Sequence, residues 1–407
     1  MMRVWLPALF ALALAGCATA GLETTIGDEG LPPAAGPAAP TLERFDGLMS
    51  RILEQTEAPG AELALVKDGR LVFARGYGHA DVGAERPMRP DTPIALANIS
   101  KTITALTVLR LCDEGKLSLD ESAFARIKIV PAGGAPADPR LAAITVRELL
   151  QHTAGWDTAK SGDPLRFRRR VSRTLRAEPI SAERLIRYMM GRKLDFDPGT
   201  RAVYSNFGYV VLGRLIEEAT GLPYEEAVRR TTLKPLGAAR LRLAPAPPDY
   251  LPGEARRYGP RSEKQLHGGL VPAAAAAGGW VGSAVDVARL LAALDGPGAS
   301  FLSAAMRREM LAAPPAPAGA RKRAAAFGLG WDRAAEDESG ATYAKEGALP
   351  GVQAWVERLK GGVTVIALFN GHGDGKFDPR GRAMSEIPAA VLATEDWPQT
   401  DLFPRFE

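Results

Sequence analysis

The sequence predicts an α+β fold in which one antiparallel sheet is built from both ends of the chain, with a large helical insertion between them. Alternating apolar and polar residues, the pattern of half-buried strands, occur at 60–81 and again from 327 to 370. Between about 100 and 294, apolar residues recur at helical spacing, interrupted by Pro and Gly. Strands at both ends with helices between them favour this architecture, and the natural cleft lies between the sheet and the helices.

Composition and charge exclude several classes of protein. The chain has 407 residues, 46% hydrophobic and 24% charged, with a net charge of +4, which is ordinary globular composition. The densest basic run, RFRRR at 166–170, contains one aromatic residue and is expected to be solvated surface rather than a nucleic-acid contact. The four histidines lie too far apart for a local metal motif. We expect no nucleic-acid partner, no metal and no cofactor.

The N-terminus predicts export and lipid anchoring. Residues 1–16 combine Arg3 with a short apolar stretch, as in a signal peptide, and end in Leu-Ala-Gly before Cys17. This ending resembles the bacterial lipobox, which implies a lipidated Cys17 and a place in the bacterial cell envelope, at the outer membrane or on its periplasmic side. A secretory signal cut near Ala18 or Ala20, or a short anchor, is the alternative. Residues 17–40, rich in Ala, Gly and Pro, are expected to form a flexible tether.

The remaining elements follow in order. A helix is expected over 41–55, capped by Thr41, and a hairpin turn at Asp68-Gly69. Three strands are expected at 327–333, 351–359 and 362–370, the last two joined by 360–362. The folded domain would span 41–395, with a sheet lobe at 41–97 and 295–395, a helical lobe at 98–294 and a tail at 396–407. Cys112, at helical spacing with apolar neighbours, is expected to be a buried, unreactive thiol.

Three short motifs resemble a known superfamily. NISK at 98–101 opens a helix, YSN occupies 204–206, and KEG at 345–347 begins a strand region. They resemble the S-x-x-K, Y-x-N and K-T-G motifs of the class C β-lactamase and penicillin-binding-protein superfamily, which also contains esterases and D-amino peptidases. VRELLQHTAGW at 146–156 and AAGGWVGSAVDVARLLAAL at 276–294 also match, in the family's order. The resemblance covers about 42–395 and implies a β-lactamase/transpeptidase-like fold.

The resemblance implies the catalytic residues position by position. In the family, a serine at the helix start attacks a carbonyl, a lysine one turn later takes up its proton, and the tyrosine is a second acid or base. Lys101 and Tyr204 match the last two roles. His152 matches a position that is structural in the family.

Ligand-binding residues are implied in the same way. Asn206, Lys345 and Gly347 match the second and third motifs, and Lys345 would attract a substrate carboxylate. The backbone N–H groups of residues 98 and Ala348 would form an oxyanion hole. Glu346 stands where the family has a hydroxyl residue, which argues against selection for β-lactam carboxylates.

The nucleophile is absent from its position, because Asn98 stands three residues before Lys101. Shifting the motif to Ser100 would place Ile103 in the lysine position, and Ser100 points about 200° away from residue 98 on a helix. An amide cannot replace the hydroxyl as a nucleophile. Asn98 is expected to cap the helix, accept a hydrogen bond from Lys101 and donate one to Tyr204.

Two functions follow from this substitution. In the first, the protein is a pseudoenzyme whose cleft binds a peptidoglycan-like or other carboxylated ligand, or a protein partner. In the second, it is an active hydrolase of an ester, amide, β-lactam or D-amino peptide bond, with direct attack by water and with Tyr204 and Lys101 as bases. The first is favoured because acylation needs the missing hydroxyl.

Overall fold

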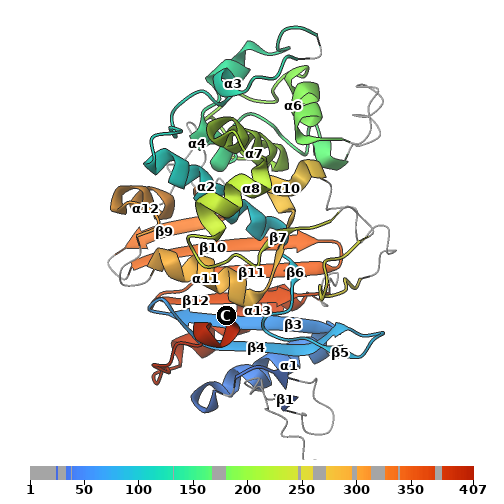
Figure 1. Cartoon of the computed structure of the whole chain (residues 1–407), viewed down its shortest axis with the longest axis vertical. Helices are drawn as coiled ribbons and strands as arrows, with labels where there is room; N and C mark the ends of the chain where they lie inside the picture. Colours follow the sequence, from blue (N-terminus) through green and yellow to red (C-terminus); the bar gives the residue numbers. More distant parts are fainter. Residues whose placement is uncertain are drawn as a thin grey trace, which may run out of the picture.

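The computed structural model describes residues 24–25, 34–37, 39–131, 133–166, 180–245, 249–259, 272–295, 300–312, 326–337, 340–371 and 378–407. Its main sheet has the order β1-β2-β4-β3-β12-β11-β10-β9, and β5 pairs with β4. All neighbouring strands are antiparallel. Because β3 pairs with β12, both chain ends form one sheet (Figure 1). The predicted α+β fold is confirmed.

The sheet strands come from two separate parts of the sequence. The N-terminal part supplies β1 (Thr24–Thr25), β2 (Ala34–Ala35), β3 (Gly60–Lys67), β4 (Arg70–Asp81) and β5 (Arg86–Pro87). The C-terminal part supplies β9 (Arg333–Asp337), β10 (Gly340–Leu349), β11 (Val352–Arg358) and β12 (Val363–Phe369). The predicted hairpin turn forms between β3 and β4, where Asp68 and Gly69 have φ of 51° and 76°, as a tight two-residue turn requires.

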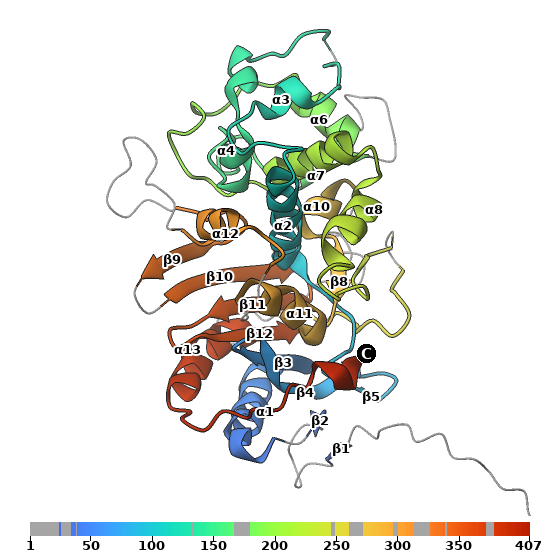
Figure 2. The ribbon, with the colours of Figure 1, turned by 60° about the vertical axis from the view of Figure 1, so that its left-hand side comes forward.

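Both faces of the main sheet are covered by helices, which explains why its strands are apolar on both sides. Leu63 and Leu65 belong to the cluster formed with α1 (Arg44–Thr56) and α13 (Pro379–Leu392). Ala64 and Val66 point to the opposite face and belong to the larger core, together with α11 (Ala284–Asp295). Figure 2 shows α1 and α13 on one side of the sheet and α11 on the other.

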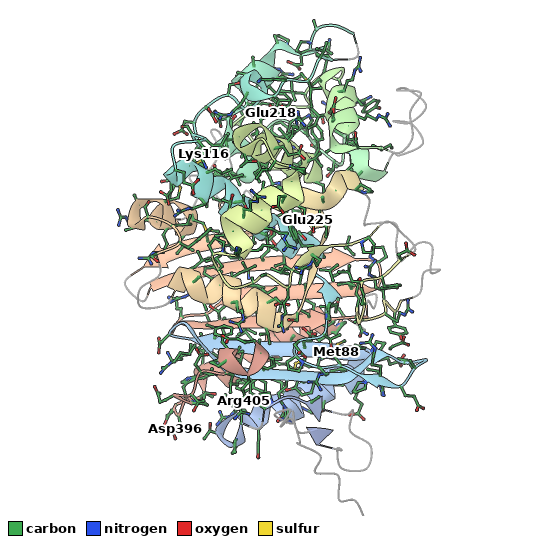
Figure 3. All side chains as sticks on the ribbon, in the orientation of Figure 1. Met88, Lys116, Glu218, Glu225, Asp396 and Arg405 are labelled. Atoms are coloured by element: carbon green, nitrogen blue, oxygen red, sulfur yellow. The ribbon has the colours of Figure 1, made fainter. Side chains whose placement is uncertain are left out.

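The helical part is organised around α2 (Ser100–Asp113), which runs from the sheet into the helical part (Figure 2). Just beyond its end, Lys116 lies on the helical side of the molecule (Figure 3). The other helices in the described residues include α3 (Ala123–Arg126), α4 (Val146–Leu150), α6 (Ala182–Met190), α7 (Asn206–Thr220), α8 (Tyr224–Val228), α10 (Ala275–Gly278) and α12 (Ala304–Leu311). A small sheet of β6 (Ile94–Ala95), β8 (Trp280–Gly282) and β7 (Arg242–Leu243) joins the two parts.

Helix α2 is buried on all sides along most of its length. Every residue from 100 to 109 is buried, including Ile103, Leu106 and Leu109. Three threonines among them donate hydrogen bonds to backbone carbonyls: Thr102 Oγ1 to Gly330 O at 3.0 Å, Thr104 Oγ1 to Ala276 O at 2.7 Å and Thr107 Oγ1 to Ile103 O at 3.0 Å. Satisfied hydroxyls allow a helix with polar residues on several sides to be buried.

Several predicted boundaries differ from the structure. Residues 327–332 are irregular backbone with bends rather than a strand, because Gly330, with φ of 92°, lies against α2, where a Cβ would come within 2.5 Å of Ala105 Cβ. Thr41 does not cap α1, whose N-cap is Glu43 without a side-chain bond. Part of the expected tether joins the sheet, since Ala34–Ala35 pairs with β4.

The lobe and tail boundaries also differ from the expectation. Helix α11, expected in the helical lobe, packs on the sheet with the core residues of β3 and β12. In the C-terminal tail, Phe403–Phe406 forms a short 3-10 helix with Phe403 and Phe406 buried. Both segments are apolar, and each covers surface of the sheet that would otherwise be exposed. Within the described ranges, no helix has the length and apolar character needed to cross a membrane.

Candidate active site

The start of α2 holds the first motif. Asn98 lies in a 3-10 turn, Ala97–Ile99, directly before the helix, and Lys101 is completely buried in the first helical turn. The Lys101 ammonium donates to Asn98 Oδ1 at 3.2 Å, to Asn206 Oδ1 at 2.8 Å and to the Ala277 carbonyl at 2.5 Å. These three oxygens match the three N–H bonds of a protonated lysine.

Asn98 makes one of the three contacts expected from the sequence. It accepts from Lys101, but the N-cap of α2 is Ile99, without a side-chain cap bond. The expected donation to Tyr204 does not form, because the Tyr204 hydroxyl has no hydrogen-bond partner among the described residues. The 3-10 turn leads into the helix without a break, which leaves the Asn98 side chain with Lys101.

The Ser100 side chain contacts β8 rather than the other side chains of the first motif. Its side chain is completely buried, and its Oγ accepts a hydrogen bond from the Trp280 backbone N–H at 3.1 Å. Ser100 therefore ties α2 to β8.

The second motif is positioned by a buried histidine. Ser205 caps α7, accepting from the Gly208 N–H, and its own backbone N–H donates to His152 Nδ1 at 3.1 Å. The His152 ring lies 4.6 Å from the Tyr204 ring. Burial, followed by the charges of Lys345 and Lys101, lowers the pKa of His152 well below its usual 6.5. A neutral His152 is therefore an acceptor that fixes the start of α7.

Tyr204 lies between two lysines. Its ring centre is 5.0 Å from Lys101 Nζ and 5.6 Å from Lys345 Nζ, within the range of cation–π contacts. Burial raises the pKa of Tyr204 well above its usual 10.0. The side chain is therefore a neutral phenol whose buried hydroxyl has no partner.

Burial also affects Lys101. It lowers the pKa of that side chain well below its usual 10.5, and the nearby charge of Lys345 lowers it further. The oxygens of Asn98, Asn206 and Ala277 favour the protonated form by hydrogen bonding. The Lys101 amino group is thus held by neutral oxygens rather than by a carboxylate.

The third motif lies on β10, against the turn that holds Asn98. A Cβ at Gly347 would lie 3.2 Å from the Asn98 backbone nitrogen and 3.1 Å from Ala97 Cβ, so glycine allows the close approach of the two segments. Ala348, the expected second oxyanion donor, follows it and is exposed. The structure thus brings the three motifs together at one place.

Lys345 differs from the expected carboxylate receptor. It is completely buried and pairs with Asp332, with 2.6 Å between Lys345 Nζ and Asp332 Oδ1. The carboxylate of the neighbouring Glu346 lies 3.5 Å from the Arg380 guanidinium and does not pair with Lys345 among the described contacts. Side chains alternate along a strand, so Glu346 and Lys345 point to opposite faces of β10.

Two acidic residues of the site were missed in the sequence. Besides Asp332, Asp163 accepts from Asn206 Nδ2 at 2.8 Å and so orients the amide that binds Lys101. Asp163 lies 43 positions from its partner and Asp332 lies 13 positions from Lys345. Neither spacing follows a helix or strand period, so no local signal predicted these pairs.

The remaining predicted residues lie outside this site. Cys17 and most of the basic run at 166–170 are outside the described residues. Burial raises the pKa of Cys112 to about 12, which agrees with an unreactive thiol. Among the described residues there is no cluster of His, Cys, Asp and Glu suited to a metal ion.

Comparisons with known proteins agree with this geometry. Esterase EstB of Burkholderia gladioli is 29% identical over 377 residues, covering 84% of this chain and 93% of EstB. The probable fimbrial assembly protein FimD, serogroup H1, of Dichelobacter nodosus is 31% identical over 253 residues, or 61% of this chain. The match spans only 60% of the length of FimD.

The fold is similar to that of a solved β-lactamase/D-alanine carboxypeptidase from Yersinia pestis, with a TM-score of 0.66 and 21% identity. That similarity covers 86% of this chain and 98% of the Yersinia chain. A family model described as beta-lactamase matches residues 45–387. The chain therefore belongs to the beta-lactamase family of serine hydrolases and related proteins.

Proposed function

We propose that this protein is an acylation-deficient member of its family, which binds a peptidoglycan-like acyl ligand or a protein partner in the former catalytic cleft. One observation carries the proposal: the amide of Asn98 lies 3.2 Å from the Lys101 ammonium, where the family's chemistry requires a hydroxyl. Removing the nucleophile of a serine hydrolase costs several orders of magnitude in rate, although binding contacts remain.

One polar group of the site, the Tyr204 hydroxyl, has no hydrogen-bond partner among the described residues. The Tyr204 hydroxyl is buried without a partner, which costs about 1–3 kcal/mol in the free protein. A ligand that accepts or donates a hydrogen bond there would recover this energy. Asn98 and Asn206, both partly exposed, offer further polar contacts beside it. These groups support ligand binding without chemistry.

The class of ligand is proposed from the names of the relatives, and the cellular location is proposed from the sequence. EstB is named an esterase and the Yersinia protein a β-lactamase/D-alanine carboxypeptidase, so an acyl compound is the favoured ligand. FimD is named a fimbrial assembly protein, which fits the alternative of a protein partner. The apolar segment ending at Cys17 supports the proposal that this binding takes place in the cell envelope, through a lipid anchor.

Labelling of the nucleophile position tests the proposal. Purified protein and its Asn98→Ser variant are treated with a fluorescent penicillin and a fluorophosphonate, followed by peptide mass spectrometry. We expect no adduct on the native protein and an adduct on the peptide containing residue 98 in the variant. A native adduct at Ser100 or Ser205 would contradict the proposal.

An active hydrolase is the second candidate, and one observation favours it. Burial lowers the pKa of Lys101, which would make its neutral amine available to activate water. The raised pKa of Tyr204 argues against this residue as the base. Ester and β-lactam turnover by native protein, abolished by Lys101→Met, would establish this alternative.

A further inference from the structure

The Lys345 ammonium forms an ion pair with Asp332 in the protein without a ligand. Asp332 Oδ1 lies 2.6 Å from Lys345 Nζ, and Asp332 Oδ2 accepts from the Glu346 N–H at 2.8 Å. Both carboxylate oxygens are therefore held by β10. The other described contact of the ammonium is the face of Tyr204, 5.6 Å away.

Asp332 is also fixed from its own side. Its backbone N–H donates to the Ala344 carbonyl at 2.9 Å. The preceding Trp331 is buried and stacked on Tyr343, with ring centres 4.2 Å apart. These contacts fix the backbone of residue 332 beside β10, which places the Asp332 carboxylate within reach of Lys345.

The two members of the pair differ in exposure. The side chain of Lys345 is 1% exposed and that of Asp332 is 22% exposed. A ligand approaching here therefore meets the acid and not the ammonium. The remaining cations of the described site are also occupied, Arg380 by Glu346 and Lys101 by three oxygens.

Two effects would disfavour a ligand carboxylate at this position. It would have to displace Asp332 to reach Lys345, or else remain beside a like charge with little solvent to screen it. An uncharged group with N–H or O–H bonds would instead donate to Asp332, and a hydrogen bond to a charged acceptor is among the stronger ones.

We propose that Asp332 determines the charge of the ligand, so that the cleft selects an uncharged acyl compound with a hydrogen-bond donor at this end and rejects the matching carboxylate. This inference rests on the proposed ligand-binding function and narrows its ligand class. It replaces the carboxylated ligand expected from the sequence.

The test compares two ligands that differ by one charge. N-acetyl-D-alanyl-D-alanine and its C-terminal carboxamide are titrated into the native protein, and the dissociation constants are measured by calorimetry. We expect the carboxamide to bind about tenfold more tightly or more, the size of one hydrogen bond to a charged group. This comparison requires no variant.

Two variants test whether Asp332 causes the preference for the carboxamide over the acid. Asp332→Asn should remove the preference or reverse it towards the acid, because Lys345 loses its carboxylate. Glu357→Gln is the matched control: Glu357 pairs with Arg333 at 3.4 Å and is similarly exposed, and its loss should leave the preference intact. Thermal unfolding verifies that each variant is folded.

The outcomes separate this inference from the function on which it rests. If the native protein binds neither compound, the proposed ligand class is wrong and the inference fails with it. If the native protein binds the acid as tightly as the carboxamide, only the inference is wrong. An unchanged preference in folded Asp332→Asn would also overturn it, whereas an unfolded variant leaves the native comparison decisive.

Discussion

Lys101 donates a hydrogen bond to Asn98 across one helical turn, with 3.2 Å between Nζ and Oδ1. The same ammonium reaches Asn206 and the Ala277 carbonyl. We propose that Asn98 occupies the nucleophile position of the family, and its amide oxygen is one of the three acceptors of Lys101. The lysine is therefore satisfied without a hydroxyl at residue 98.

Restored acylation should depend on Lys101. In the Asn98→Ser background, Lys101→Met should slow acylation by an activated ester by about 10²- to 10⁴-fold, the usual contribution of a positioned base. Because the base is the neutral amine, the rate should fall as the pH falls through the lowered pKa of Lys101. Stopped-flow measurements of leaving-group release test both effects. Ser100→Ala, made as a control, should leave the rate unchanged, and a loss there would point to Ser100 as the nucleophile.

Removing the Tyr204 hydroxyl should leave the stability of the protein constant or slightly higher, but should weaken ligand binding. Tyr204→Phe deletes a buried group without a partner, so the free energy of unfolding should stay constant or rise by up to about 1 kcal/mol. Affinity for the acyl ligand should fall about tenfold if that hydroxyl binds it. Urea unfolding and calorimetry measure the two effects. A variant destabilised by more than about 2 kcal/mol would show that the hydroxyl has a partner in the free protein.

Acid should destabilise the protein through His152. The pKa of His152 in the folded protein lies well below 6.5, so below pH 6.5 the unfolded chain binds a proton that the folded chain does not. Its contribution is therefore fully present above that pH and is lost as the pH falls, by up to about 1.4 kcal/mol per pH unit.

His152→Asn is the matched variant for this measurement. Asparagine tolerates the φ of 57° at this position, and its oxygen can accept from Ser205. Urea unfolding at pH 7.5 and 5.5 should show a smaller loss of stability in the variant. Equal losses in the two proteins would exclude His152 as the source.

Lipid anchoring should depend on Cys17. Cys17→Ser should move the protein from the detergent phase to the aqueous phase in a partitioning experiment, because the acyl chains would no longer be attached. Unchanged partitioning would indicate that the apolar N-terminal segment is an uncleaved anchor. Cys112→Ser is the control and should partition as the native protein does.

The sequence determined the features that depend on neighbours in the chain. The spacing of Asn98 and Lys101 fixes their contact because three positions make one helical turn, and Asp68-Gly69 fixes the β3–β4 hairpin through its backbone conformation. The alternating strands at both chain ends likewise predicted the sheet. The family resemblance then placed three distant motifs together, which spacing alone cannot do.

Only the tertiary structure decided the charge of the site. Asp332 reaches Lys345 because the turn at Gly330 packs against α2 and brings residue 332 beside β10. Asp163 reaches Asn206 through a loop, and Glu346 pairs with Arg380 at the start of α13. Such polar contacts depend on the path of the whole chain and on burial, which removes the competing water. The sequence therefore predicted the substitution at Asn98, whereas packing determined how the charged groups of the site are paired.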